Sequence, residues 1–149
     1  MSAPRTRQQR KRDTLTRLRQ DVDAWVATGG DGLPYLVPLS FLWDGETLLI
    51  ATAAASPTAR NLQETGRVRI GIGPSRDVVL VDGVVQALAM TDLPEEVGDA
   101  FAAKTGFDPR RYSAPYLYFR VRPRRVQAWR EVDEHDGRDL MRDGRWLTA

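Results

Sequence analysis

The sequence of 149 residues contains no cysteine and a single histidine, His135. The lack of cysteine excludes a disulfide framework, a thiol nucleophile and a cysteine-ligated zinc or iron–sulfur site. A single histidine argues against a histidine-rich metal site and against a Ser-His-Asp triad. We therefore expect any redox or transfer chemistry to come from a bound group, and we assign no metal ligand and no catalytic side chain.

Long apolar runs are also missing. No stretch approaches the roughly 20 apolar residues of a membrane-spanning helix. The arginine-rich beginning of the sequence lacks the apolar segment of a secretory signal. These two absences predict a cytoplasmic protein without a membrane partner.

Basic residues are present but unevenly distributed. The first 20 residues contain seven arginines or lysines and one acidic residue, although the whole chain has a formal net charge of only +2. We interpret residues 1–13 as a basic, disordered and solvated tail. An amphipathic helix over Thr14–Val22 then opens a single domain that spans residues 14–149. Nucleic acid is not an expected partner, because the tail lacks aromatic residues that could stack on bases.

Short apolar runs separated by turn residues dominate the rest of the chain. Asp44-Gly45 and Asp82-Gly83 each lie between two apolar runs, which is typical of β-hairpins. Helices are predicted only as insertions, after Ser56-Pro57 and from Asp92 to Lys104. Because no regular strand–helix alternation occurs, the fold class is mainly β, an antiparallel barrel of six to seven strands with peripheral helices.

Two local features suggest a binding site. Pro38 interrupts an apolar run and cannot donate a ladder hydrogen bond, so it indicates an edge, a bulge or a strand that faces something other than a neighbouring strand. Further along, a strand ending at Thr52 is followed by a helix start, whose free N–H groups and dipole suit a phosphate. Hydroxyls and the Arg60 guanidinium would add donors there. The alternative is ordinary capping by Ser56, a solvated Arg60 and a local backbone bond from Asn61.

Several segments together resemble a known family. They are the segments 32–41, 43–45, 56–62, 66–70 and 78–85, in this order along the chain. With them, residues 20–148 resemble the split β-barrel flavin and deazaflavin oxidoreductases related to pyridoxamine 5′-phosphate oxidase. The resemblance implies a homodimer that binds its cofactor in a groove between the protomers, with the ring against Leu36–Ser40 and the phosphate near Thr52–Asn61. The cofactor-binding residues predicted in this way are Val37, Pro38, Leu39, Ser40, Thr52, Ser56, Thr58, Arg60 and Asn61.

The chain departs from this family at positively charged positions. Phosphate-binding members carry a lysine where this chain has Thr58, and the oxidases carry an arginine and a lysine along the strand matching 34–40. Each missing cation removes a charge-assisted hydrogen bond of about 1.5–3 kcal/mol. The cofactor is therefore either FMN or coenzyme F-420, with F-420 slightly favoured. Arg60 could replace part of the missing charge, and the further candidates for this are Arg67, Arg69 and Arg76.

The resemblance implies hydride transfer between the cofactor and a small conjugated substrate. Aromatic side chains could line the substrate face, although aromatic residues in strands more often pack in a core. The candidates are Tyr35, Tyr112, Tyr116, Tyr118 and Trp129. The alternative function is a non-catalytic carrier of a flavin, a deazaflavin or a haem-like molecule.

Overall fold

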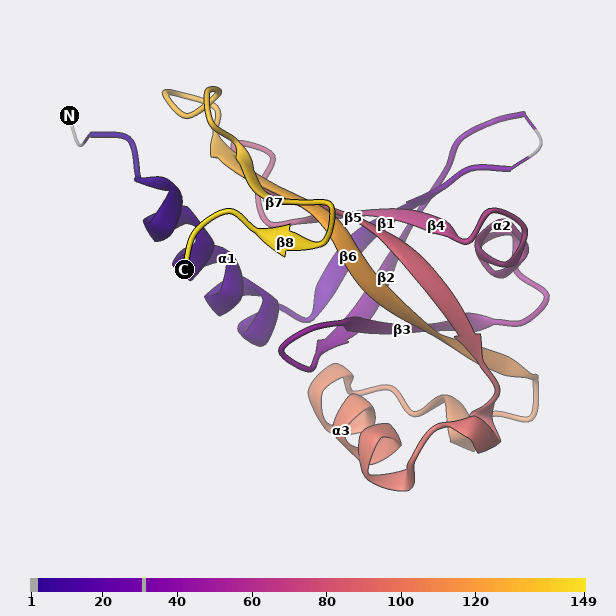
Figure 1. Ribbon diagram of the computed structural model, residues 1–149. Coiled ribbons are helices and arrows are strands. Elements are labelled where there is room, and N and C mark those ends of the chain that lie inside the picture. The colour runs from indigo at the N-terminus through magenta and orange to yellow at the C-terminus, as the bar shows by residue number, and fades with distance from the viewer. Residues whose placement is uncertain (1–2, 31) are drawn as a thin grey trace.

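The computed structural model describes residues 3–30 and 32–149 and contains one antiparallel sheet of eight strands (Figure 1). Neighbouring strands follow the order β3-β2-β1-β4-β5-β6-β7-β8, and β3 also pairs with β6. That last pairing closes β1 to β6 into a barrel. The strands are β1 (Asp23–Thr28), β2 (Tyr35–Trp43), β3 (Leu48–Ala53), β4 (Arg67–Ile72), β5 (Asp77–Leu88), β6 (Tyr116–Arg130), β7 (Asp139–Arg142) and β8 (Arg145–Trp146). The predicted antiparallel barrel is confirmed.

The barrel interior is filled by the alternate side chains of each strand. β4 shows the pattern most clearly, because Val68, Ile70 and Ile72 are buried while the alternating residues Arg67 and Arg69 are exposed. Period-2 alternation places every second side chain on the same face of a strand. Each fully buried aliphatic or aromatic side chain contributes about 1.5–3 kcal/mol relative to an exposed one.

β5 and β6 are each a single long strand, which corrects two sequence predictions. The hairpin predicted at Asp82-Gly83 is wrong: β5 continues through it, with a register shift between these residues. Gly83 is opposite Pro123, and a Cβ at Gly83 would lie 2.7 Å from Val121 Cγ1. Glycine is therefore needed here for the close approach of two strands rather than for a turn. Likewise, the break predicted between two strands at residues 122–125 is absent, since β6 runs through Pro123.

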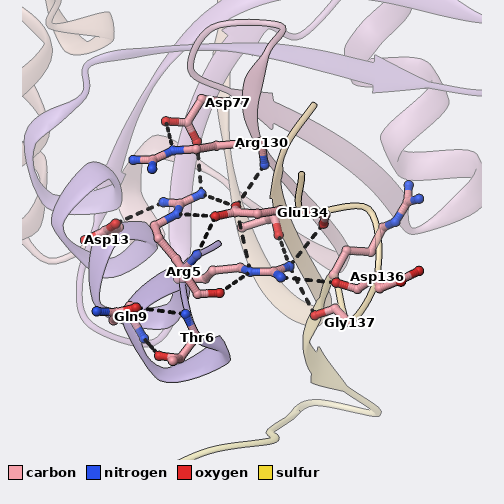
Figure 2. Close-up of polar contacts among 12 residues, drawn as sticks. Arg5, Thr6, Gln9, Asp13, Asp77, Arg130, Glu134, Asp136 and Gly137 are labelled. Atoms are coloured by element: carbon pink, nitrogen blue, oxygen red, sulfur yellow. Dashed lines mark hydrogen bonds and ion pairs between the residues drawn. The ribbon is translucent and has the colours of Figure 1, made fainter. Parts of the chain in front are cut away.

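The N-terminal segment is ordered, which corrects the prediction of a disordered, solvated tail for residues 1–13 over the part that the structure describes. Helix α1 (Arg7–Gln20) begins before Thr14, where the sequence predicted it to start. Thr6 caps it, and Gln9 completes a capping box. Arg5 bonds Glu134, a residue 129 positions further along the chain (Figure 2). Long-range ion pairing of this kind leaves no local signal in a sequence. Met1 and Ser2 lie outside the described residues.

Two more helices flank the barrel. Helix α2 (Pro57–Thr65) follows its predicted Ser56 cap and ends at Gly66, whose φ of 67° is left-handed. Helix α3 (Glu95–Thr105) ends at Gly106 and packs against β2. Short 3-10 helices, η1 (Met90–Asp92) and η2 (Pro109–Arg111), lie on either side of α3. Across residues 3–30 and 32–149, no helix combines the length and the apolar character needed to cross a membrane.

Candidate cofactor groove

The barrel is open between β2 and β3. β2 pairs with β1 over Tyr35–Ser40, but it pairs with β3 only over Phe41–Trp43. β3 continues past this point against β6, as far as Ala53. The two strands therefore diverge, and a groove of about 540 Å³ lies beside the gap. Its walls are Pro38, Leu39 and Ser40 on one side and Ala51, Thr52 and Ala53 on the other.

Pro38 presents its backbone to this groove. The Phe41 N–H donates to the Val22 carbonyl at 2.9 Å, so the backbone polar groups of Phe41 point toward β1. Because these groups alternate in direction along a strand, those of Pro38 point the opposite way, toward the gap left by β3. Proline therefore removes no hydrogen bond from the β1–β2 ladder. Among the residues that the structure describes, the Pro38 carbonyl has no ladder partner on this side, which matches one of the environments predicted for this residue.

Most of the predicted phosphate-binding side chains either make hydrogen bonds within the protein or are buried. The Ser56 hydroxyl accepts from the Ala59 N–H and lies 3.1 Å from the Thr52 hydroxyl. Thr58 is 2% exposed, so its side chain faces the interior. The Asn61 amide donates to the Thr28 hydroxyl at 3.1 Å and links α2 to β1. The capping alternative for Ser56 is confirmed, whereas Asn61 bonds a distant side chain rather than its local backbone.

The groove thus brings together four of the nine predicted residues: Pro38, Leu39, Ser40 and Thr52. The other five do not line it. Val37 packs against the barrel core, while Arg60 is exposed on the first turns of α2. The structure thus brings three of the four predicted residues of β2 together with Thr52 of β3, while cofactor binding by them stays a prediction. The sequence could not show that the Ser56 hydroxyl would be used in capping α2.

An aromatic cluster of Phe107, Tyr112 and Tyr116 lies beside the groove, and Phe107 and Tyr116 line it. The ring centroids of Phe107 and Tyr116 lie 5.5 Å apart, and Tyr112 lies 5.0 Å from Phe107 and 5.8 Å from Tyr116. Phe101 of α3 also lines the groove. Of the predicted aromatic candidates, Tyr116 lines the groove and Tyr118 is fully buried beneath it. Phe101 and Phe107 were missed because their position depends on how α3 docks, which no local pattern encodes.

Positive charge is absent from the groove lining. Among the residues that the structure describes there, the one ionisable carboxylate is Asp23, which accepts a hydrogen bond of 2.9 Å from the Ser40 hydroxyl. The described parts of the chain also contain no cluster of three metal-ligating side chains. The groove therefore suits an uncharged planar group that offers hydrogen bonds at its edge, more than it suits a phosphate.

An apolar row, exposed at Pro38 and Trp25 and half-buried at Gly71 and Leu80, borders the groove on the outer face of the barrel. Pro38 pairs with Trp25, Trp25 pairs with Gly71, and Gly71 pairs with Leu80. Trp25 is 55% exposed, and the Leu80 side chain lies close above Gly71. Trp25 is thus a large apolar side chain that lies half in water beside other apolar groups.

Comparisons with known proteins agree with this geometry. The family model described as pyridoxamine 5'-phosphate oxidase matches residues 14–130. No curated protein sequence matches significantly. Among solved structures, a putative pyridoxamine 5'-phosphate oxidase from Listeria innocua superposes with a TM-score of 0.63 at 15% identity, covering 79% of this chain and 96% of that chain.

Two further structures share the fold. A FAD-binding protein from Mesorhizobium loti has a TM-score of 0.64 and 22% identity, and the match covers 78% of this chain and 89% of that chain. A protein described as an F420 reductase has a TM-score of 0.59 and 22% identity, with 74% and 93% covered. At such identities these likenesses concern the fold.

Proposed function

Because the chain belongs to the pyridoxamine 5'-phosphate oxidase family, we propose that it is a cytoplasmic oxidoreductase that binds a flavin or deazaflavin in the groove between β2 and β3. The reaction is hydride transfer between coenzyme F-420, or FMN, and a small conjugated substrate. Similar folds described as FAD-binding and as an F420 reductase support this class of cofactor.

The observation that carries the proposal is the Pro38 carbonyl facing the gap between β2 and β3. The polar edge of a flavin or deazaflavin ring carries N–H and carbonyl groups, and an acceptor fixed in a strand can orient it. When bound, the cofactor supplies the hydride-transfer chemistry. Pro38, Ser40 and Thr52 would position the ring, while Phe107 and Tyr116 would exclude water from the part of the groove that they line.

The residues fit the ring better than they fit a terminal phosphate. Arg60 is the one exposed cation among the nine predicted residues, and neither Arg67, Arg69 nor Arg76 lines the groove. Arg69 is also engaged by Asp82 at 2.6 Å. FMN binding depends on its terminal phosphate, so this shortage of cations keeps F-420 slightly favoured over FMN.

We propose in addition that the protein works as a homodimer whose interface includes the apolar row Pro38, Trp25, Gly71 and Leu80. The row adjoins the groove through Pro38. A second copy placed on it would bury Trp25 and add a wall to a groove that is open in the single chain. A dimer of this kind would complete the site.

The alternative is a non-catalytic carrier of the same class of molecule. It is favoured by the groove lining, where Asp23 is the one ionisable carboxylate and is already bonded to Ser40. Hydride transfer itself needs no acid or base from the protein. The shortage of ionisable side chains in the groove is therefore compatible with both functions, and a kinetic measurement must distinguish them. Steady oxidation of reduced cofactor by a quinone or nitro compound would contradict the carrier.

The proposal is tested by titrating the protein separately with FMN and with F-420 while following tryptophan fluorescence. Saturable quenching by one of them is expected, since Trp25 lies opposite Pro38. A Trp25→Phe variant provides the control: it should lose most of the quenching signal while a direct binding measurement still detects the cofactor. If folded protein binds neither cofactor, the proposal is wrong.

A further inference from the structure

A second concave site lies far along the sheet from the groove, where α1, β6, β7 and the segment between β6 and β7 meet. It has a volume of about 470 Å³ and shares no lining residue with the groove. Four arginines line it, from α1 (Arg7), β6 (Arg125), the segment before β7 (Arg138) and β7 (Arg142). We call it the arginine pocket.

The arginine pocket is electropositive. Its acidic lining residues are Asp136 and Asp139, against four arginines, so its formal charge is +2 with His135 neutral. Guanidinium groups remain charged at every ordinary pH and present forked N–H donors that match phosphate oxygens. A concave surface lined by charges of one sign concentrates the electrostatic potential. A positive lining of this kind favours the binding of an anion.

One carboxylate fixes two of the guanidinium groups. Asp139 accepts from Arg125 Nε at 3.0 Å and from Arg142 at 2.8 Å. The terminal nitrogens of Arg125 have no acceptor within the described parts of the chain, so their donors stay available. Burial alone would raise the pKa of Asp139, but hydrogen bonds from Arg142 and Arg125 outweigh this and lower it. Asp139 therefore stays ionised and holds both arginines in place.

Arg138 is oriented by two other contacts. Its Nε donates to the His135 carbonyl at 3.0 Å, and its guanidinium carbon lies 4.6 Å from the Trp129 ring centroid. Stacking of this kind holds the planar group while leaving its terminal nitrogens free to donate. Arg7, in the first turn of α1, is exposed.

Polar contacts anchor the segment that supplies Asp136 and Gly137 to the pocket, as Figure 2 shows for these residues. Arg10 is 6% exposed, and its guanidinium donates to five backbone carbonyls, those of Arg5, Ala128, Glu134, Asp136 and Gly137. The Glu134 carboxylate is 1% exposed and accepts from Arg5 at 2.8 Å. These bonds hold the segment that carries Asp136 and Arg138 in place. Binding of a ligand would therefore cost little conformational entropy in this segment.

We propose that the arginine pocket binds the phosphate group of a small molecule. Four guanidinium groups that line one site suit a dianionic or pyrophosphate-like oxyanion, for which bidentate contacts are strongest. The Arg138 guanidinium lies over the nearby Trp129 ring, so this ring is not free to stack on a base, and we favour a small molecule over a nucleic acid. This site is independent of the proposed function.

The test is calorimetric titration of the whole protein with inorganic pyrophosphate at constant ionic strength. Saturable binding is expected for the unmodified protein, and Arg7→Glu should weaken it about tenfold or more. Arg12→Glu is the matched control, since Arg12 is exposed on the same helix, outside the pocket, and makes the same change in net charge. The control should change the affinity less than about twofold.

Amide shifts in an NMR titration give a second readout, with the largest changes expected at Gly137 and Arg138. Absence of saturable binding up to about 10 mM pyrophosphate would overturn the proposal. Equal weakening by Arg7→Glu and Arg12→Glu would also overturn it, because the effect would then be diffuse.

Discussion

Pro38 and Trp25 lie directly opposite each other in the β1–β2 ladder. Opposite residues in an antiparallel pair project to the same face, so both side chains lie on the outside of the barrel. The backbone of Pro38 meanwhile faces the gap between β2 and β3. One residue thus borders both the groove and the apolar row, which is why we connect cofactor binding with dimer formation.

The apolar row makes a prediction about oligomeric state. Trp25→Glu should convert a dimer into a monomer of 16.8 kDa, because a buried, unpaired carboxylate at an interface costs several kcal/mol. Sedimentation velocity at micromolar concentration measures this. Folding should be unaffected, since Trp25 is 55% exposed in the single chain. Val132→Glu is the control, because Val132 is 79% exposed and lies away from the row. A wild-type protein that is already monomeric would refute the dimer.

The barrel core makes a prediction about stability. Ile70 is fully buried in β4, and Ile70→Ala should lower the free energy of unfolding by about 2–5 kcal/mol. Urea denaturation followed by circular dichroism measures the difference. Leu33→Ala is the matched control, since Leu33 is 87% exposed and its truncation should change the stability by less than about 0.5 kcal/mol. Similar losses in the two variants would contradict the burial pattern.

The close approach of β5 and β6 makes a second prediction about stability. Gly83→Ala should destabilise the protein by about 1–3 kcal/mol, because the new Cβ would lie 2.7 Å from Val121 Cγ1 and 2.8 Å from the Arg122 carbonyl oxygen. Gly29→Ala is the control, since nothing lies within 4 Å of a Cβ there. If Gly83→Ala unfolds at the same urea concentration as wild type, the continuous strand pairing at this position is wrong.

The Arg5–Glu134 pair predicts a dependence of stability on pH. Burial alone would raise the pKa of Glu134, but hydrogen bonds from Arg5 and from the backbone N–H groups of Arg5 and Arg130 lower it to about 2, from 4.5. A lowered pKa contributes stability that is fully present above pH 4.5 and is lost as the pH falls toward 2. Arg5→Ala should therefore cost about 3 kcal/mol or more at pH 7 and much less near pH 2.

Urea denaturation at several pH values measures this effect, with Arg12→Ala as the control. The control should cost little at either pH, because Arg12 is exposed. A penalty for Arg5→Ala that stays constant down to pH 2 would show that Glu134 is not the partner that matters.

Much of the fold was predictable because its signals are local. The turn at Asp44-Gly45 joins β2 to β3 as expected, and Ser56 caps α2. Asp82-Gly83 carries the same dipeptide but lies within a strand, because pairing with β6 extends on both sides of it. The local signal could not reveal that distant partner.

The site was predictable in part for the same reason. Pro38 and Ser40 stand out along one strand, and the strand after the hairpin supplies Thr52. The aromatic part of the groove depends on the docking of α3, and the order of the N-terminal segment depends on Glu134. Both are tertiary effects, which no pattern of neighbouring residues encodes.

The most direct test of the cofactor groove is an NMR titration with FMN and with F-420 that follows the Pro38 carbonyl carbon and the Ser40 amide. The account predicts that a saturating cofactor shifts both signals strongly, while those of Ile70 in the barrel core barely move. Binding that leaves Pro38 and Ser40 unshifted, with the changes confined to other surfaces, would contradict it.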